Sequence, residues 1–266
     1  MSEGTAVFLG ETYFMKPAQG FQVAFNGYSG NAAFEEWHSH ENPSFSLLLS
    51  GTYEEELHLK HYKRVPGDLK FVPENEVHRC SHYVQGTRKI NLELSREWLQ
   101  QMEVSQQQLD LLTTQAMPTK FNLLKVFHEM QDPGEQSKAS AELLLYGWLQ
   151  GQHALQKTAV RNPPAWVGLL KEYLHDQWDS KFVLEVIARE AGIHPVSLSK
   201  YFPKYFSATL GNYINQIKID KSLSLIRTSS GSLTDIAYRC GFADQAHFTR
   251  TFKAVTGYLP KDFRKI

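Results

Sequence analysis

Three histidines in the first third of the chain have the side chains and spacing to bind a metal ion. His38 and His40 lie two residues apart at the predicted end of a strand, and His78 follows further along. Three imidazoles could hold Zn²⁺, Fe²⁺ or Ni²⁺ and leave coordination positions open for water or another ligand. Histidines at this spacing on a strand also share one face without any metal, so the same pattern fits a polar pocket that holds no metal.

A different chemistry is indicated near the C-terminus, where residues 188–206 and 237–256 repeat one pattern once a residue is added in the second turn. The matched pairs are Ala188 with Ala237, Gly192 with Gly241, Leu198 with Phe248, Lys200 with Arg250, and Phe202 with Phe252. The glycine lets the chain leave a first helix in a left-handed conformation. The large apolar residues, four apart, anchor a second helix to a core. Each segment therefore predicts a helix-turn-helix motif whose cation faces away from that core.

The elements that carry these residues change character along the chain. From Phe8 to Leu94 apolar and polar residues alternate in short runs, which predicts antiparallel strands. Helical spacing follows and predicts two or three helices. Asn162-Pro163-Pro164 marks a boundary, and short helices follow it, with a long one over about 207–227. Among them, Ser232–Asp235 has the pattern of a capping box.

Composition supports a folded chain of more than one domain. The 266 residues are 42% hydrophobic, a share typical of folded proteins with packed cores and not of disordered chains. The net charge of zero divides unevenly, because residues 1–163 hold 14 basic and 19 acidic side chains and residues 164–266 hold 14 and 9. A basic domain beside an acidic one is typical of a nucleic-acid-binding protein with a second module. We expect three parts: residues 1–96, 97–162 and 163–266.

The cysteines and the hydropathy pattern predict the compartment. Cys80 and Cys240 fall in different predicted domains, so no disulfide framework is expected and a reducing environment fits. The sequence contains no signal-peptide pattern and no uninterrupted apolar run of about 18 residues. These features predict a cytoplasmic protein that does not enter a membrane.

The segment Leu184–Arg264 resembles the AraC/XylS family of transcription regulators. The positions that agree with the family pattern are Leu184, Ile187, Ala188, Gly192, Leu198, Phe202, Tyr213, Ile219, Leu225, Ile236, Ala237, Gly241, Phe242, Asp244, Phe248, Arg250, Phe252, Lys253, Gly257, Pro260 and Arg264. Mild departures are Lys200 and Lys218 in place of arginines, Pro203 where a lysine is common, and Ser222 in place of an alanine.

This resemblance implies two recognition helices, over about 195–204 and 244–255, that enter successive major grooves about 34 Å apart. The residues expected to bind DNA are Val196, Ser199, Lys200, Gln245, Thr249, Arg250 and Lys253. Arg250 can fork onto a guanine, Gln245 can pair with an adenine, and Val196 could touch a thymine methyl group. Lys200 and Lys253 could equally contact phosphates, and each of these residues could instead be a solvated helix face.

The N-terminal region resembles the two motifs of the cupin family, whose metal site uses three histidines and a glutamate. His38, His40 and His78 match, but Ser44 and Phe45 stand where the glutamate is usual, and Asn75 replaces a glycine of the second motif. The resemblance implies a cupin-like β-barrel with a pocket for a small-molecule effector or a divalent transition metal. We expect that pocket to be lined by Trp37, His38, His40, Phe45 and His78.

Together these patterns predict a multidomain α and β fold: an N-terminal cupin-like β-barrel sensor domain, a helical linker or assembly segment, and a C-terminal all-α DNA-binding domain with two helix-turn-helix motifs. The predicted function is a sequence-specific transcription regulator, not an enzyme, that is controlled by an effector. Its expected partners are double-stranded DNA, a small-molecule effector and RNA polymerase, and it would act as a monomer or homodimer. The alternatives are a metal-dependent cupin enzyme with a helical appendage, and a DNA-binding protein without an effector. The effector, the operator and the choice between activator and repressor are not determined by the sequence.

Overall fold

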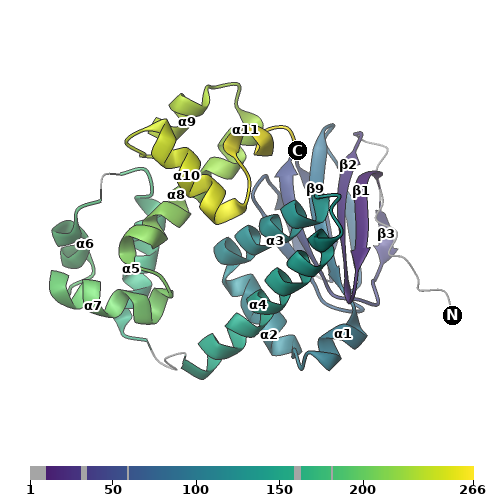
Figure 1. Cartoon of the computed structure of the whole chain (residues 1–266), viewed down its shortest axis with the longest axis horizontal. Coiled ribbons are helices and arrows are strands. Elements are labelled where there is room, and N and C mark those ends of the chain that lie inside the picture. Colours follow the sequence, from purple (N-terminus) through teal and green to yellow (C-terminus); the bar gives the residue numbers. More distant parts are fainter. Residues whose placement is uncertain (1–9, 31–34, 59, 159–162, 181) are drawn as a thin grey trace. The chain divides into compact units, whose positions relative to one another are not determined.

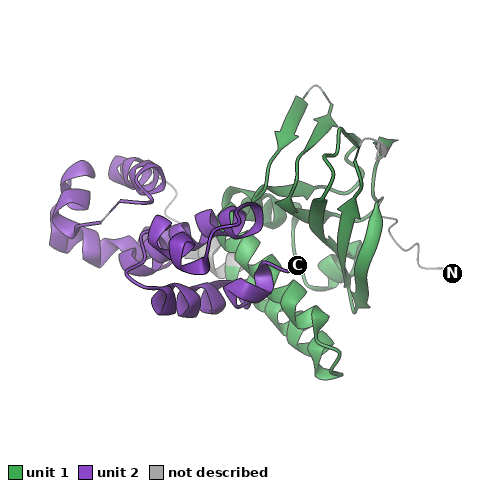
Figure 2. Ribbon diagram, turned by 90° about the horizontal axis from the view of Figure 1, so that it is seen from above, with its two compact units in different colours: residues 1–153 green, residues 154–266 purple. Residues whose placement is uncertain are grey.

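The structure is a computed structural model that describes residues 10–30, 35–58, 60–158, 163–180 and 182–266. The chain divides into two compact units, Met1–His153 and Ala154–Ile266 (Figure 2). The first unit combines strands with helices, and the described part of the second is helical. This order agrees with the predicted α and β fold. Phe8 and Asn162, which mark two of the predicted boundaries, lie outside the described residues, and the division at residues 96 and 162 stays a prediction.

The first unit contains two antiparallel sheets. The five-stranded sheet has the order β1-β2-β9-β4-β7, and the four-stranded sheet has the order β3-β8-β5-β6. The strands are β1 (Glu11–Ala18), β2 (Phe21–Tyr28), β3 (Glu35–His38), β4 (Ser44–Ser50), β5 (Tyr53–Leu57), β6 (Lys60–Arg64), β7 (Leu69–Val72), β8 (His78–Ser81) and β9 (Thr87–Leu94).

Four helices follow the sheets, where the periodicity had predicted two or three. They are α1 (Arg96–Gln101), α2 (Gln106–Thr114), α3 (Ala116–Gln131) and α4 (Gln136–Thr158) (Figure 1). Two of them begin at serine caps, because Ser95 accepts from the backbone of Trp98 and Ser105 forms a capping box with Gln108. A side-chain oxygen at this position satisfies backbone N–H groups that the first helical turn leaves unpaired.

One face of the five-stranded sheet is apolar and packs against helices. Side chains alternate along Thr87–Leu94, so its isoleucine and leucines share one face and its lysine, asparagine and glutamate share the other. On the apolar side, the ring centroids of Phe25 and Phe127 of α3 lie 5.7 Å apart. The rings of Phe45 and Trp148 of α4 are also 5.7 Å apart. One part of the hydrophobic core therefore lies between this sheet and helices α3 and α4.

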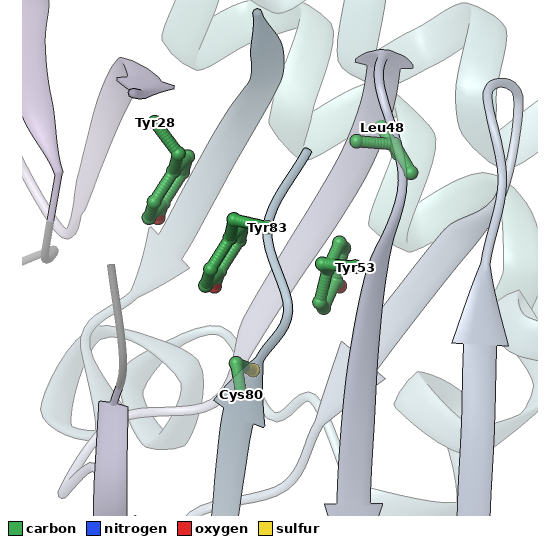
Figure 3. Packing of buried hydrophobic residues seen from close by; sticks show 5 residues of the cluster. All are labelled: Tyr28, Leu48, Tyr53, Cys80 and Tyr83. Atoms are coloured by element: carbon green, nitrogen blue, oxygen red, sulfur yellow. The ribbon is translucent and has the colours of Figure 1, made fainter. Parts of the chain in front are cut away.

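The opposite face of that sheet carries polar residues and turns toward the four-stranded sheet. Tyr28 and Tyr83 stack with centroids 4.0 Å apart, and Tyr53 lies 5.0 Å from Tyr83 on its other side (Figure 3). The Lys89 ammonium lies 4.5 Å from the Tyr28 ring and 4.7 Å from the Tyr53 ring, and it donates to the Tyr83 hydroxyl at 3.0 Å. Ring faces attract a cation, so this cluster can accommodate a buried charge between the sheets.

A buried ion pair also joins the two sheets. Glu55 on β5 has no exposed side-chain surface, and its carboxylate contacts the Lys70 ammonium of β7, which is 7% exposed. The Arg64 guanidinium of β6 donates to the same carboxylate from Nε at 2.8 Å. Burial alone would raise the pKa of Glu55, but the charges and hydrogen bonds of Lys70 and Arg64 hold it below its usual range.

The prediction of a barrel is wrong for a closed barrel, although the β-rich character of this region is confirmed. Among the described residues no strand pairs across the two sheets, so β1 and β7 remain the edges of one sheet and β3 and β6 the edges of the other. Closure would need hydrogen-bonded pairing at those edges. Side-chain contacts such as that between Lys70 and Glu55 join the sheets instead.

Beyond the end of α4, the described part of the second unit contains seven helices. They are α5 (Ala165–Asp176), α6 (Leu184–Glu190), α7 (Pro195–Phe206), α8 (Leu210–Thr228), α9 (Leu233–Arg239), α10 (Gln245–Thr256) and α11 (Pro260–Phe263) (Figure 1). Ser232 and Asp235 form the predicted capping box at the start of α9. Helix α8 contacts α7, α9, α10 and α11, so it is the scaffold on which both predicted motifs pack. Across the described chain, no helix is both long and apolar enough to span a bilayer.

Candidate nucleic-acid interface and histidine cluster

Each helix-turn-helix motif is built on fully buried apolar residues. Leu198 and Phe202 of α7 have no exposed surface, and the same holds for Phe248 and Phe252 of α10. Residues four apart lie on one face of a helix, so each pair anchors that face to the core. This confirms their predicted role and leaves the opposite faces of α7 and α10 available to solvent.

The turns that place α7 and α10 use the predicted glycines. Gly192 has φ +67° and Gly241 has φ +69°, values that favour a residue without a Cβ atom. In each motif, the residue just before the second helix caps that helix with its side chain. The His194 imidazole accepts from the backbone N–H of Val196 at 3.2 Å, and the Asp244 carboxylate accepts from the backbone N–H of His247 at 2.7 Å. These caps set where α7 and α10 begin.

The residues predicted to bind DNA all lie on α7 and α10. The exposed ones are Val196, Ser199, Lys200, Gln245, Arg250 and Lys253, and Thr249 is half-buried. Val196 is 68% exposed, which is a high value for an apolar side chain on a packed helix. The two helices therefore present these side chains together on accessible surfaces, while contact with DNA stays a prediction.

The side chain of Gln245 is already engaged within its own motif. Its Oε1 accepts from the Thr234 hydroxyl at 2.6 Å, which links the start of α10 to α9. Pairing with an adenine uses both the carbonyl and the amino group of a glutamine. Gln245 would therefore have to exchange its contact with Thr234 for a base.

The three predicted histidines converge in the first unit. One ring nitrogen from each of His38, His40 and His78 lies within 4.8 Å of the other two. The ring centroids of His38 and His78, which pair across β3 and β8, are 4.4 Å apart. His40 lies 4.9 Å from His38 and 5.3 Å from His78. Strand pairing and the two-residue spacing together produce this cluster.

Backbone carbonyl groups orient two of these rings. The Nδ1 atom of His38 lies 2.6 Å from the Glu36 carbonyl oxygen, and that of His78 lies 3.0 Å from the Glu76 carbonyl oxygen. A carbonyl only accepts, so Nδ1 carries a proton, and in the neutral ring it is then Nε2 that offers a lone pair. Burial lowers the pKa of His78 to about 4, with the charge of Lys70 adding to the effect. His78 is then neutral near pH 7, which is the form that binds a metal.

The cluster fits a three-nitrogen metal site in its donor set. Metal–nitrogen bonds of about 2.0–2.1 Å require the nitrogens to approach more closely than the 4.8 Å limit found here. The residues at the position of the cupin glutamate are Ser44 and Phe45, and neither supplies a carboxylate. His38, His40 and His78 could therefore hold a divalent transition metal after a small inward movement, with other positions left to water or a ligand.

Two predicted pocket residues are not brought to the histidines. Trp37 neighbours His38 on β3 and so points to the opposite face, where its half-exposed ring lies 5.2 Å from the Arg79 guanidinium. Phe45 lies on the helix-covered face of its sheet, against Trp148. The predicted pocket therefore reduces to its three histidines.

Charged residues that were not predicted from the sequence lie beside this cluster. Lys70 acts electrostatically on His78 and also contacts the buried carboxylate of Glu55. The sequence feature that pointed to Glu55 was the alternation in β5, which places this residue on the same face as Tyr53 and Leu57. That pattern marks Glu55 as a buried position, whereas its pairing with Lys70 depends on how the two sheets pack.

The geometry of the second unit defines a class of protein: a helix-turn-helix protein with two tandem motifs joined by one long helix. Residues 187–266 match a family model described as a helix-turn-helix domain. This segment, with the motif residues that it contains, is the part of the chain that is similar to the AraC/XylS family.

Curated relatives cover part of the chain. The transcriptional activators RhaS of Escherichia coli O139:H28 and of Escherichia coli strain SE11 are each 29% identical to it over 133 residues. The match covers 48% of this chain and 47% of each relative, so the chain spans about half the length of the curated relatives it matches.

Solved structures show a weaker likeness. ToxT from Vibrio cholerae is 12% identical, with 92% of this chain and 98% of that protein covered and a TM-score of 0.37. An AraC-type transcriptional regulator from Chromobacterium violaceum is 19% identical, with 38% and 89% covered and a TM-score of 0.36. Scores of this size do not establish a common overall structure.

Proposed function

We propose that the protein is a sequence-specific DNA-binding transcription regulator. The observation that carries this proposal is the pair of helices α7 and α10, each of which buries one face and leaves the predicted DNA-binding residues accessible on the other. The RhaS relatives are described as transcriptional activators, which supports the same function here. Activation would involve RNA polymerase as a further partner.

The chemistry of the exposed residues assigns their roles. The Arg250 guanidinium has the fork geometry that recognises guanine, and Val196 offers an apolar contact for a thymine methyl group. Gln245 would read adenine after leaving Thr234. Lys200 and Lys253 would contact phosphates, which position a protein on the duplex without reading its sequence.

The histidine cluster is the proposed control site. A small-molecule effector would bind beside His38, His40 and His78, either directly or through a divalent transition metal that they hold. In this proposal residues 1–96 form a cupin-like sensor domain, residues 97–162 a linker or assembly segment, and residues 163–266 the DNA-binding domain of a cytoplasmic monomer or homodimer. A cupin enzyme is the second candidate, and the missing carboxylate ligand disfavours it.

The DNA-binding proposal is tested by substituting Arg250 and Lys253 separately in the full chain. Arg250→Ala should weaken binding to a selected site by about 1 to 3 kcal/mol and change binding to random DNA little. Lys253→Ala should weaken both about equally and should reduce the salt dependence of the affinity. Titration of labelled duplexes at several salt concentrations measures both effects. Equal losses for the two variants on both DNAs would reassign Arg250 to the phosphate backbone, and the absence of salt-dependent binding would refute the function.

The control-site proposal is tested with His40→Ala and a matched variant, His61→Ala. His61 is an exposed imidazole on β6, paired with Glu54 at 3.3 Å. Metal analysis should find close to one equivalent in the wild type and in His61→Ala, and much less in His40→Ala, because two imidazoles rarely retain a metal that three were needed to hold. If the site binds only an organic effector, no metal is found and His40→Ala alone changes the thermal stabilisation by that effector. A folded His40→Ala chain with full metal and an unchanged effector response would exclude this histidine from the site.

A further inference from the structure

Helix α8 carries a buried lysine at the point where the two helix-turn-helix motifs meet. Lys218 is 9% exposed, and its Nζ donates to the carbonyl oxygen of Gly241 at 2.6 Å. Gly241 lies in the turn between α9 and α10, so this bond ties the turn of the second motif to the scaffold helix. An ammonium group that is buried and engaged in this way is not available to contact a phosphate.

The first motif reaches the same lysine. The Lys218 Nζ atom lies 6.0 Å from the ring centroid of Phe182 and 5.7 Å from that of Phe242. Phe182 stands just before α6 of the first motif, and Phe242 stands just before α10 of the second. A cation between two ring faces is attracted to both. Lys218 therefore interacts with both motifs at once.

The turn of the second motif also lies close to the backbone of the segment that leads into the first motif. A Cβ atom added at Gly241 would lie 3.0 Å from the Lys218 Nζ atom and 3.4 Å from the carbonyl oxygen of Asp179. Asp179 belongs to the connection between α5 and α6, so the turn of the second motif packs beside the segment that leads into the first. The equivalent glycine of the first motif, Gly192, would meet nothing within 4 Å. The close contacts at Gly241 therefore come from Lys218 and from the segment before the first motif. They do not come from the turn itself, because the same turn at Gly192 has no such contacts.

Each motif has further attachments to its own end of α8. Near the start of the helix, Tyr213 lies 3.2 Å from His175 Nε2 through its hydroxyl and contacts the Phe206 ring edge-on at 5.0 Å. Near its end, Arg227 donates to the Arg264 carbonyl oxygen at 2.8 Å. These contacts hold each motif to the scaffold, and the contacts of Lys218 link one motif to the other.

We propose that Lys218 is a positioning residue that sets the angle between the two motifs and, through it, the spacing of the DNA subsites that they read. This inference rests on the proposed DNA-binding function. Two linked binding modules gain affinity only when both can engage simultaneously. One added base pair rotates one subsite relative to the other by about 35° and shifts it by about 3.4 Å. If the angle between the motifs is fixed, the protein should bind such a site weakly, because both motifs cannot engage at once. If the angle can vary, the affinity for that site should fall less.

The test measures binding of the full chain to three duplexes. The first carries the selected site, the second has one base pair inserted between the two subsites, and the third has one subsite scrambled. The main variant is Lys218→Met, which keeps a long unbranched side chain and removes the charge and the hydrogen bond. Lys218→Arg restores a cationic donor, and Lys265→Met is the control because it removes a largely exposed charge from the same unit. Gly241→Ala is a further variant, which alters the contact with Lys218 from the side of the second motif.

The wild type should bind the inserted site at least about tenfold more weakly than the selected site. Lys218→Met should lose about tenfold on the selected site, keep its affinity for the scrambled duplex, and discriminate less than about threefold against the insertion. Lys218→Arg should recover the discrimination, and Lys265→Met should keep it.

Two results would overturn the inference. One is a folded Lys218→Met chain with wild-type discrimination, and the other is an equal loss on all three duplexes, which indicates a role in stability alone. If circular dichroism shows that Lys218→Met is unfolded, Gly241→Ala decides the question by the same criteria. A wild-type chain without any specific site would instead refute the proposed function, which keeps the two failures distinguishable.

Discussion

Removal of one partner from the ion pair between the sheets should destabilise the first unit strongly. Glu55 has no exposed side-chain surface and Lys70 is 7% exposed, so neither can turn to water when its partner is lost. Leaving a buried charge without its partner costs about 3 to 5 kcal/mol. Glu55→Met should reach this range. Lys70→Met should cost less, about 1 to 3 kcal/mol, because Arg64 still donates to the carboxylate at 2.8 Å.

The double variant is the informative member of this series. With both charges replaced by methionine, the remaining Arg64 is 18% exposed and can extend its guanidinium toward solvent. The double variant should therefore be more stable than Glu55→Met and close to the wild type, since buried pairs are often replaced by apolar residues without loss. The difference between the double variant and the sum of the single ones is the coupling energy of the pair.

Hydrogen exchange of β5 and β7 measures these effects without requiring the two units to unfold together. Peptides from both strands report the opening free energy of the first unit, and peptides from α8 serve as an internal reference. The effect should also depend on pH in a defined direction. Because the pKa of Glu55 is lowered in the folded state, its contribution is present above the unfolded value of about 4.3 and is lost as the pH falls through the folded value. The difference in opening free energy between the wild type and Glu55→Met should become smaller only in that acidic range.

Two observations would refute this reasoning. Additive single and double variants would mean that Glu55 and Lys70 do not interact in solution. If the difference in opening free energy instead grew toward acid pH, the Glu55 carboxyl group would be protonated in the folded state. That would contradict the effect of its two cationic neighbours, Lys70 and Arg64.

Three further predictions concern the second unit. Gly192→Ala should cost about 1 kcal/mol for its left-handed backbone, and Gly241→Ala should cost more because its new methyl group meets neighbouring atoms; equal losses in urea unfolding would contradict this. Burial raises the pKa of Cys240 to about 11, so only about 0.1% of this thiol is thiolate at pH 8. Iodoacetamide should therefore label Cys240 far more slowly in the folded chain than in unfolded protein, and rapid labelling of the folded chain would show that the thiol is accessible. Ser232→Ala should cost about 1 kcal/mol by removing the acceptor that caps α9, with faster hydrogen exchange there as the readout; unchanged exchange would mean that Asp235 suffices.

The helical unit could be predicted closely because its signals are local. The left-handed glycines Gly192 and Gly241 and the capping box at Ser232 each depend on a few neighbouring residues, and all three are confirmed. The buried pairs on α7 and α10 follow from a spacing of four residues, which holds in any helix. Local chemistry of this kind does not change with the position of distant segments.

The β-rich unit was less predictable because its alternation leaves one question open. A period of two separates the two faces of a strand, but it does not say which face receives the helices. Phe45 was expected in the interior and instead packs against Trp148 of α4, whereas the polar residues of β9 face the other sheet. The convergence of His38 and His40 could be predicted from their spacing. The charge of Lys70 beside them could not, because it comes from a strand of the other sheet.

Helix α8 has a consequence for the DNA as well as for the protein. Its 19 residues span about 28 Å without a break, and both motifs pack on it. In the proposed regulator, a duplex whose subsites are out of phase would then have to adapt to the protein by bending or untwisting. Such deformation costs about 1 to 6 kcal/mol and depends on the stacking of the base steps that are deformed. Base pairs between the two subsites would therefore influence affinity although no side chain touches them, and flexible pyrimidine–purine steps there would favour binding.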